Sequence, residues 1–268
     1  MWNLLHPRKL GHLTSAFFAQ HLQYRLEILF WLLSHAWPFF WMALWSQAAA
    51  GGSLAHPPTD YVRYFFFAWL AGVFNVTWSG YLLSYAVRSG DLSFLLLRPF
   101  PPFFDFLTEH LGTNLVQLPL AALVAAAVLV LLPETRALPP ETRALPPLLP
   151  FLALLVLYFA FEYVFGWLLG SLAFWFEKSE NFYEFYAALR VYFGGMALPL
   201  IAMPVGVRKL LLWTPLPYYA YAPGALAAGW PLDLGRAALV LVLWTGFVGL
   251  LAGVLWRAGL RRYGAVGG

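Results

Sequence analysis

The sequence predicts an all-α integral membrane protein, and three observations support this fold class. The 268 residues are 62% hydrophobic and 10% charged, with a mean hydropathy of +0.70, whereas soluble domains have roughly 25% charged residues. Several apolar stretches reach the roughly 20 residues that a helix needs to cross a hydrocarbon core about 30 Å thick. These stretches are continuous runs rich in Leu, Ala, Phe and Trp, unlike the alternating segments of about ten residues that form barrel strands.

The apolar runs predict six transmembrane helices in one domain, 1–268. The predicted spans are 26–50, 61–87, 107–132, 148–176, 185–205 and 234–256. Between the last two, residues 206–230 are apolar but are interrupted by Pro215, Pro217, Pro223 and Gly224. Neither half of this stretch is long enough to span. We expect a re-entrant or interfacial hairpin packed against protein, with a plain hydrophobic loop as the alternative.

The distribution of Lys and Arg predicts that both termini are cytoplasmic. With the N-terminus inside, the inner segments hold Arg8, Lys9, Arg25, Arg88, Arg98, Lys178, Arg190, Arg257, Arg261 and Arg262. The outer segments hold Arg63, Arg136, Arg143, Arg208, Lys209 and Arg236. The positive-inside rule favours this orientation, which places 88–105 in the cytoplasm and both 133–147 and 206–230 outside.

One internal repeat is present, the heptapeptide ETRALPP at 134–140 and again at 141–147. A single tandem duplication of seven residues is too short for a solenoid, whose units have about 20 residues or more. We interpret it as a lengthened external loop, because the free energy of loop closure rises only slowly with length.

The sequence contains none of the common catalytic motifs. The absence of Cys excludes disulfides, thiol catalysis and thiolate metal sites. There is no G-x-x-x-x-G-K-[ST] phosphate loop, no H-E-x-x-H and no G-x-S-x-G, and the six His residues lack metal-ligand spacing. We therefore predict no catalytic residue, no metal ligand and no cofactor bound by this chain, and an intramembrane enzyme is disfavoured.

A candidate translocation path is predicted from residues inside the fourth and fifth spans. Glu162 lies near the middle of the fourth span, where a carboxylate costs roughly 2.5–3.5 kcal/mol. It is either a cavity-facing group that contacts substrate, such as a cation, or a protonated or hydrogen-bonded structural residue. In the fifth span, Gly194, Gly195 and Pro199 predict a closely packed and bent helix that lines the same path. Packing alone is the alternative for these three.

The cytoplasmic loop 88–105 predicts a short helix between the second and third spans. Gly90 ends the preceding helix, Ser89 or Asp91 can cap a new one, and Arg98-Pro99 stops it.

Leu92, Leu95 and Leu96 are spaced three to four residues apart, which predicts one apolar face. That face could pack on the membrane or on another protein, and an ordinary interfacial helix is the alternative.

Four motifs in order resemble the ABC-2 family of ATP-binding-cassette permeases. VRSGDLSFLLLRPFPPFF at 87–104 resembles the cytoplasmic loop of a poorly characterised bacterial branch, with its basic residue, G-x-L and L-x-R-P. LQYRLEILFWLL at 22–33 is similar to that branch's entry into the first helix, and GSLAFWFEKSENFYEF at 170–185 to its exit from the fourth. YFGGMALPLIAMP at 192–204, followed by LLLWTPLPYYAYAPGALAAG at 210–229, resembles its G-x-x-x-P-L helix and external hairpin. The tandem ETRALPP departs from the pattern.

The resemblance implies a permease subunit of an exporter in the bacterial plasma membrane. Transport would be by alternating access, driven by a separate dimer of ATPase subunits that binds ATP and Mg. A second permease, identical or related, would complete the complex, and no nucleic acid is expected.

Within this chain, the resemblance implies a coupling loop and an amphipathic N-terminal segment. The segment 1–25 would contain an elbow helix at about 9–24. In the coupling loop, Arg88, Asp91 and Arg98 would orient the helix on the ATPase, and Leu92, Leu95 and Leu96 would fill its groove. The implied coupling residues are Arg88, Gly90, Asp91, Leu92, Leu95, Leu96, Arg98 and Pro99.

Two other function classes stay open. An ion-driven secondary transporter would contain several intramembrane acids and inverted repeats. A membrane scaffold that transports nothing would also be compatible with six spans. The identity of the substrate is not indicated by the sequence.

Overall fold

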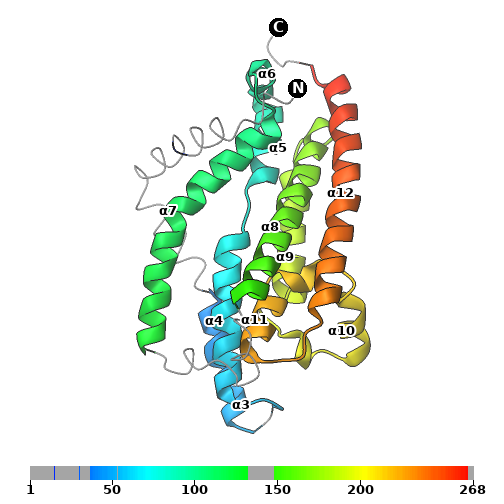
Figure 1. The fold of residues 1–268 in the computed structure, drawn as a ribbon. Coiled ribbons are helices and arrows are strands. Elements are labelled where there is room, and N and C mark those ends of the chain that lie inside the picture. The colour runs from blue at the N-terminus through cyan, green and yellow to red at the C-terminus, as the bar shows by residue number, and fades with distance from the viewer. Residues whose placement is uncertain (1–14, 16–29, 31–36, 53, 132–147, 265–268) are drawn as a thin grey trace.

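The structure, a computed structural model, describes residues 15, 30, 37–52, 54–131 and 148–264 (Figure 1). The described chain is helical and contains no strand. Its helices are α3 (Trp37–Ala50), α4 (Pro58–Asn75), α5 (Ser79–Ser89), α6 (Leu92–Leu97), α7 (Pro102–Leu131), α8 (Leu148–Ser171), α9 (Glu180–Phe193), α10 (Val205–Leu211), α11 (Tyr221–Ala228) and α12 (Leu234–Arg262). The tandem ETRALPP falls outside the described residues, and so does the predicted elbow helix apart from residue 15.

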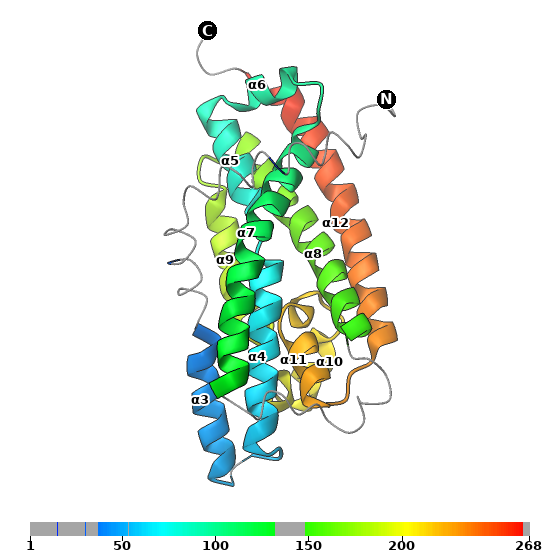
Figure 2. The same ribbon diagram turned by 60° about the vertical axis from the view of Figure 1, so that its left-hand side comes forward.

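The long helices run between two ends of an elongated bundle. Helix α6 and the C-terminal end of α12 lie at one end, while α10 and α11 lie toward the other (Figures 1 and 2). Helix α8 packs along α12 and α5, and α4 packs against α3 and α11. The predicted coupling loop and the predicted hairpin therefore lie at opposite ends of the molecule.

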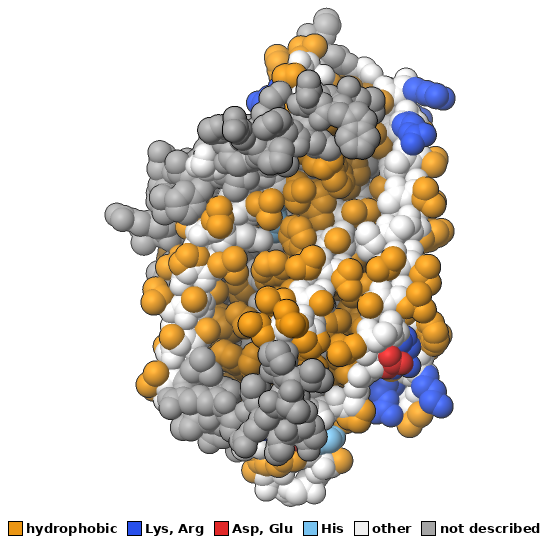
Figure 3. Space-filling model, viewed as in Figure 1, with side chains coloured by type: hydrophobic (Ala, Val, Ile, Leu, Met, Phe, Trp, Pro, Cys, Tyr) orange, Lys and Arg blue, Asp and Glu red, His pale blue; other side chains and the backbone are white. Residues whose placement is uncertain are grey.

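Within the described residues, four helical segments are long and apolar enough to cross a membrane: Pro58–Ser89, Pro102–Val128, Leu148–Phe174 and Leu234–Arg262. On the face drawn in Figure 3, apolar side chains cover the middle, and Lys and Arg lie near the two ends of α12. The predicted multi-pass membrane protein is confirmed, but six spans are not. The first predicted span, 26–50, falls partly outside the described residues, and its described helix α3 has 14 residues.

The prediction of one continuous fifth helix at 185–205 is wrong. Helix α9 begins at Glu180 and ends at Phe193, and Gly195 follows with a φ of +89°. The backbone here is held by other elements, because the carbonyl of Gly195 accepts a hydrogen bond from the Tyr64 hydroxyl at 2.6 Å. Pro199 therefore does not bend a helix and instead precedes a short 3-10 turn, Leu200–Ala202.

The second predicted span, 61–87, is broken in the middle. Helix α4 ends at Asn75 and α5 begins at Ser79. At the break, the hydroxyl of Tyr183 on α9 donates a hydrogen bond of 2.8 Å to the carbonyl of Thr77. A carbonyl that leaves a transmembrane helix needs such a partner. The break thus joins the second span to α9.

Small residues bring α8 close to α5. A Cβ atom placed on Gly170 would lie 2.8 Å from the carbonyl oxygen of Gly80, and one on Gly166 would lie 3.2 Å from the amide nitrogen of Gly80. This close approach is typical of small residues at helix interfaces in membranes. It fixes α8 beside the break between α4 and α5.

The predicted hairpin at 206–230 contains two short helices, α10 and α11, with a 3-10 turn at Leu216–Tyr218 between them. All but one residue of α11 are buried, and α11 packs on α4. The re-entrant or interfacial character of the segment stays a prediction. Its external location stays a prediction.

Candidate functional site

Glu162 lies at the centre of a polar cluster inside the bundle. It is 0% exposed, and its carboxylate accepts hydrogen bonds from the hydroxyls of Tyr158 at 3.0 Å, Tyr186 at 2.7 Å and Tyr183 at 3.3 Å. Arg190 on α9 forms a hydrogen-bonded ion pair with the same carboxylate. Of the two alternatives for Glu162, the structure favours the hydrogen-bonded one.

The assignment of Arg190 to the cytoplasmic charges is wrong. This residue is 6% exposed, and its guanidinium carbon lies 4.4 Å from the centroid of the Tyr219 ring. A buried charge is stable only when it is paired and hydrogen-bonded, and Glu162 provides that partner. The cytoplasmic count of Lys and Arg is therefore smaller by one.

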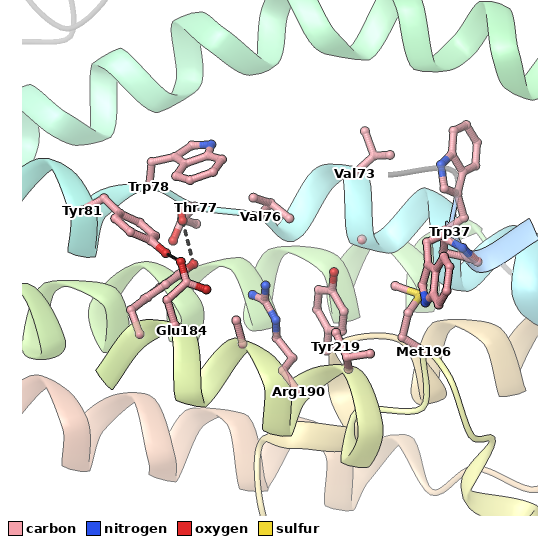
Figure 4. A pocket seen from close by; sticks show the side chains of 16 residues that line it. Trp37, Val73, Val76, Thr77, Trp78, Tyr81, Glu184, Arg190, Met196 and Tyr219 are labelled. Atoms are coloured by element: carbon pink, nitrogen blue, oxygen red, sulfur yellow. Dashed lines mark hydrogen bonds between the residues drawn. The ribbon is translucent and has the colours of Figure 1, made fainter. Parts of the chain in front are cut away.

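A cavity of about 500 Å³ lies in front of this cluster, between α3, the break between α4 and α5, and α9 (Figure 4). Its volume is within the range of small-molecule sites. Arg190 and Glu184 project into it from α9, and Thr77 faces them from the break (Figure 4). The Tyr81 hydroxyl donates a hydrogen bond to Glu184.

None of the predicted path residues Glu162, Gly194, Gly195 and Pro199 lines this cavity. All four are buried. Gly195 is needed where it is because a Cβ atom there would lie 2.6 Å from the Cβ of Tyr221. The observed role of Gly194, Gly195 and Pro199 is packing, and that of Glu162 is the polar cluster with Arg190.

The sequence feature that could have indicated the cavity is the spacing of three residues on α9. Residues 183, 187 and 190 are three to four apart and therefore share one helix face, and all three line the cavity. This face was missed because the predicted fifth span began at residue 185 and Arg190, near its start, was counted among the cytoplasmic charges.

Several buried polar atoms near the cavity have no hydrogen-bond partner among the described residues. These atoms are Arg190 Nε, Thr77 Oγ1 and both side-chain polar atoms of Asn75. Most buried polar groups in proteins are paired, so this part of the bundle has free hydrogen-bonding capacity.

The ends of the predicted coupling helix are confirmed, but its capping is different. Gly90 ends α5 in the left-handed conformation with a φ of 84°, and Arg98 follows the last residue of α6. Asp91 occupies the N-cap position without a capping hydrogen bond from its side chain. Instead, the Ser89 hydroxyl donates to the Asp91 carboxylate at 2.7 Å.

The apolar face predicted from Leu92, Leu95 and Leu96 packs mainly on its own bundle, not on the membrane or another protein. Leu92 is 0% exposed and Leu95 is partly buried, both in the same core cluster, whereas Leu96 is 42% exposed. Leu92 therefore packs inside its own subunit and does not fit the groove-filling role that the resemblance implied. The most exposed apolar side chains of α6 are Phe94 at 70% and Leu97 at 83%.

The two arginines of the loop contact their own subunit. Arg88 pairs with Glu180 of α9 at 2.7 Å, and Arg98 pairs with Asp105 of α7 at 2.9 Å. These contacts hold the loop on the bundle, which differs from the implied role of orienting it on an ATPase. Asp91 and Pro99 are exposed.

The C-terminal end of α12 also supports the loop. The hydroxyl of Tyr263 donates a hydrogen bond of 3.1 Å to the carbonyl of Gly90. Within the described ranges, no group of three or more His, Cys, Asp or Glu side chains could hold a metal ion.

The broken helices and the cavity lie inside a bundle with several candidate membrane spans, which defines the chain as a multi-pass membrane protein. The sequence model of the ABC-2 family transporter proteins matches residues 60–267, which is more than half of the chain. The chain therefore belongs to the ABC-2 transporter family, as its motifs predicted. No curated protein matches it. Members of this family are membrane subunits and not themselves ATPases, and in general they work with an ABC ATPase subunit.

Proposed function

We propose that this chain is the permease subunit of an ATP-driven exporter in the bacterial plasma membrane. A dimer of separate ATPase subunits, which binds ATP and Mg, would contact it at the cytoplasmic end. A second permease, identical or related, would complete the pathway. Both termini would be cytoplasmic.

The observation that carries this proposal, beside the family membership, is the surface of α6. Phe94 and Leu97 project from the end of the bundle with 70% and 83% of their surface exposed. Their helix is fixed from two sides by Arg88 and Arg98. Apolar side chains exposed at a surface mark a contact site for protein or membrane, and the family membership favours protein here.

In the proposed mechanism, closure of the ATPase dimer on ATP would push this loop and shift the permease between two conformations. A ligand shifts such an equilibrium only by its differential affinity for the two states. The loop can transmit the movement because Arg88 contacts Glu180 at the start of α9. Helix α9 carries Glu184 and Arg190 into the cavity.

An ion-driven secondary transporter receives no specific support. Such a transporter would use intramembrane acids to carry protons or ions. Glu162, which is the acid predicted well inside the span, is paired with Arg190. A scaffold that transports nothing would not need a cavity of about 500 Å³ with charged and aromatic side chains in its wall.

The proposal is tested at the loop. Phe94→Ser combined with Leu97→Ser should abolish copurification of the ATPase while leaving the permease folded. Leu243→Ser on α12, where the side chain is 60% exposed, is the matched control and should retain the ATPase. Arg98→Ala or Leu95→Ala should uncouple ATP hydrolysis from transport without loss of membrane insertion. Unchanged copurification and coupling in all these loop variants would contradict the proposal.

A further inference from the structure

A second hollow, an apolar groove, lies between the start of α7, α8 and α12. Its volume is about 300 Å³, and every residue that lines it is apolar or glycine. Phe103 of α7, Trp167 of α8 and Trp256 of α12 contribute aromatic rings to its wall. Phe103 and Trp256 are partly exposed, so the groove is open at the surface of the bundle.

The open side of the groove faces the hydrocarbon of the membrane. Its walls on α8 and α12 belong to the candidate spans Leu148–Phe174 and Leu234–Arg262. On the same stretch of α12, Leu250 and Val254 are 74% and 63% exposed. Side chains of this kind are matched by lipid tails, which are as apolar as Leu. A molecule that enters the groove therefore comes from the bilayer.

Two glycines of α12 make room in the groove. Gly249 and Gly253 both line it. A Cβ atom on Gly253 would project into open space with no contact within 4 Å, and one on Gly249 would meet only Val164, at 3.7 Å. No close approach of another helix therefore explains these two glycines. Their effect is to leave a channel along α12 that a larger side chain would fill.

Two arginines continue the row of these glycines. The glycines, Arg257 and Arg261 follow one another at intervals of four residues on α12, so they lie along one side of the helix, about 6 Å apart along its axis. Both arginines are exposed, and neither has an acidic side chain within salt-bridge distance in the described part of the chain. The channel therefore leads from an apolar groove to two positive charges at the end of the bundle.

Two acids at this end of the bundle are already paired. Asp105 and Glu180 form ion pairs with the two arginines of the loop 88–105. The arginines of α12 are left to bind an anion from outside the chain. Arg is well suited to phosphate, because its planar group donates two parallel hydrogen bonds to the oxygens. A phosphate joined to an acyl chain complements both parts of the surface.

We propose that the groove and the arginine pair bind one anionic phospholipid of the cytoplasmic leaflet. One acyl chain lies along Gly249 and Gly253, and the phosphate contacts Arg257 and Arg261. The lipid connects α12 to the start of α7, where the loop 88–105 ends. The inference does not depend on an ATPase, and only the choice of leaflet follows from the proposed orientation.

The test titrates the purified full-length chain in mild detergent with phosphatidylglycerol or phosphatidylcholine of identical acyl chains. Native mass spectrometry counts the lipids bound at each concentration. We expect one saturable site for phosphatidylglycerol and about tenfold weaker binding of phosphatidylcholine, because each arginine near an anionic headgroup raises the affinity several-fold. Glycerol 3-phosphate should not bind, because it has no chain to fill the groove.

Gly253→Leu fills the groove and should weaken phosphatidylglycerol binding several-fold. Gly246→Leu is the matched control, because a Cβ atom at Gly246 also has no contact within 4 Å but Gly246 does not line the groove. It should bind the lipid like the unmodified chain. Thermal unfolding of each variant shows that the protein used is folded.

Arg257→Gln combined with Arg261→Gln should weaken phosphatidylglycerol binding by about tenfold or more and remove the preference over phosphatidylcholine. Arg208→Gln combined with Lys209→Gln is the control for the loss of two positive charges. These residues are on α10, which lies toward the other end of the bundle (Figure 1), so this variant should keep the site and its preference.

Equal affinity for the two lipids would overturn the inference, and so would unchanged phosphatidylglycerol binding in folded Gly253→Leu or in the folded double arginine variant. Glycerol 3-phosphate bound as tightly as the lipid would also overturn it, by showing a site for free phosphate. Failure of the proposed function has a different signature. Lipid selectivity in a protein that recruits no ATPase would keep this inference and remove the ATP-driven exporter, and an ATPase that copurifies with a chain lacking lipid selectivity would do the reverse.

Discussion

Arg190 on α9 and Glu162 on α8 form an ion pair in the interior of the bundle, where they are 6% and 0% exposed. The pair connects a helix that ends in the middle of the bundle to one that crosses it. Three tyrosine hydroxyls also donate to Glu162. This cluster therefore holds α9, and with it one wall of the cavity, against α8.

Removal of either charge should be strongly destabilising. Glu162→Gln or Arg190→Met leaves the other residue buried without its counter-charge, which costs about 3–5 kcal/mol. The double variant should recover most of the loss, because a neutral pair of similar volume has no buried charge to compensate. Thermal unfolding of the purified chain in detergent measures the effect. Single variants as stable as the unmodified protein would contradict the pairing.

Gly195→Ala should destabilise the turn that follows α9. The φ of +89° disfavours any side chain, and the added Cβ would meet Tyr221. We expect a loss of roughly 1–3 kcal/mol in the free energy of unfolding. Gly246→Ala on α12, where a Cβ meets nothing within 4 Å, is the control and should be neutral or slightly stabilising. Equal effects at the two positions would argue against the observed backbone.

Two leucines of α6 should respond differently to truncation. Leu92→Ala removes a fully buried side chain and should cost about 2–5 kcal/mol of stability. Leu97→Ala removes a side chain that is 83% exposed, so stability should change by no more than about 0.5 kcal/mol. In contrast, Leu97→Ala should weaken ATPase binding. Unfolding midpoints and copurification together separate the two effects. A larger loss of stability in Leu97→Ala than in Leu92→Ala would show that α6 faces the other way.

The contact between Arg88 and Glu180 should persist at neutral pH and weaken only in acid. The hydrogen bond from the Glu180 backbone at the start of α9 lowers the pKa of this carboxyl, and Arg88 lowers it further, against partial desolvation. A lowered pKa in the folded state gives stability that is present above the ordinary pKa of about 4.5 and is lost as the pH falls through the lowered value. Glu180→Gln should therefore be less stable than the unmodified chain at pH 7, and the difference should shrink on acidification. If the difference in stability between the two proteins did not change between pH 7 and acid pH, the charge of Glu180 would be excluded as its cause.

Features set by local chemistry were predictable from the sequence. The spans that begin at residues 148 and 234 were predicted with the starts that α8 and α12 have. The glycine that ends α5 was identified because only Gly adopts the left-handed conformation without strain. The apolar pattern also indicated the membrane environment.

Features that depend on contacts between distant residues were not predictable. The break at 76–78 contains neither Gly nor Pro, and the buried carbonyl of Thr77 accepts a hydrogen bond from Tyr183, 106 positions further along the chain. The partner of Glu162 is 28 residues away on another helix. The sequence alone indicated that burial of this carboxylate costs free energy, but only the structure could identify the residue that pairs with it.

Isolation of the protein from native membranes in mild detergent, with identification of what copurifies and an assay of ATP hydrolysis, is the most direct test of the central claim. The account predicts a P-loop ATPase in the complex, active with Mg and ATP, that is lost from the Phe94→Ser and Leu97→Ser double variant. A folded permease that copurifies with no ATPase and shows no nucleotide-dependent change would contradict it.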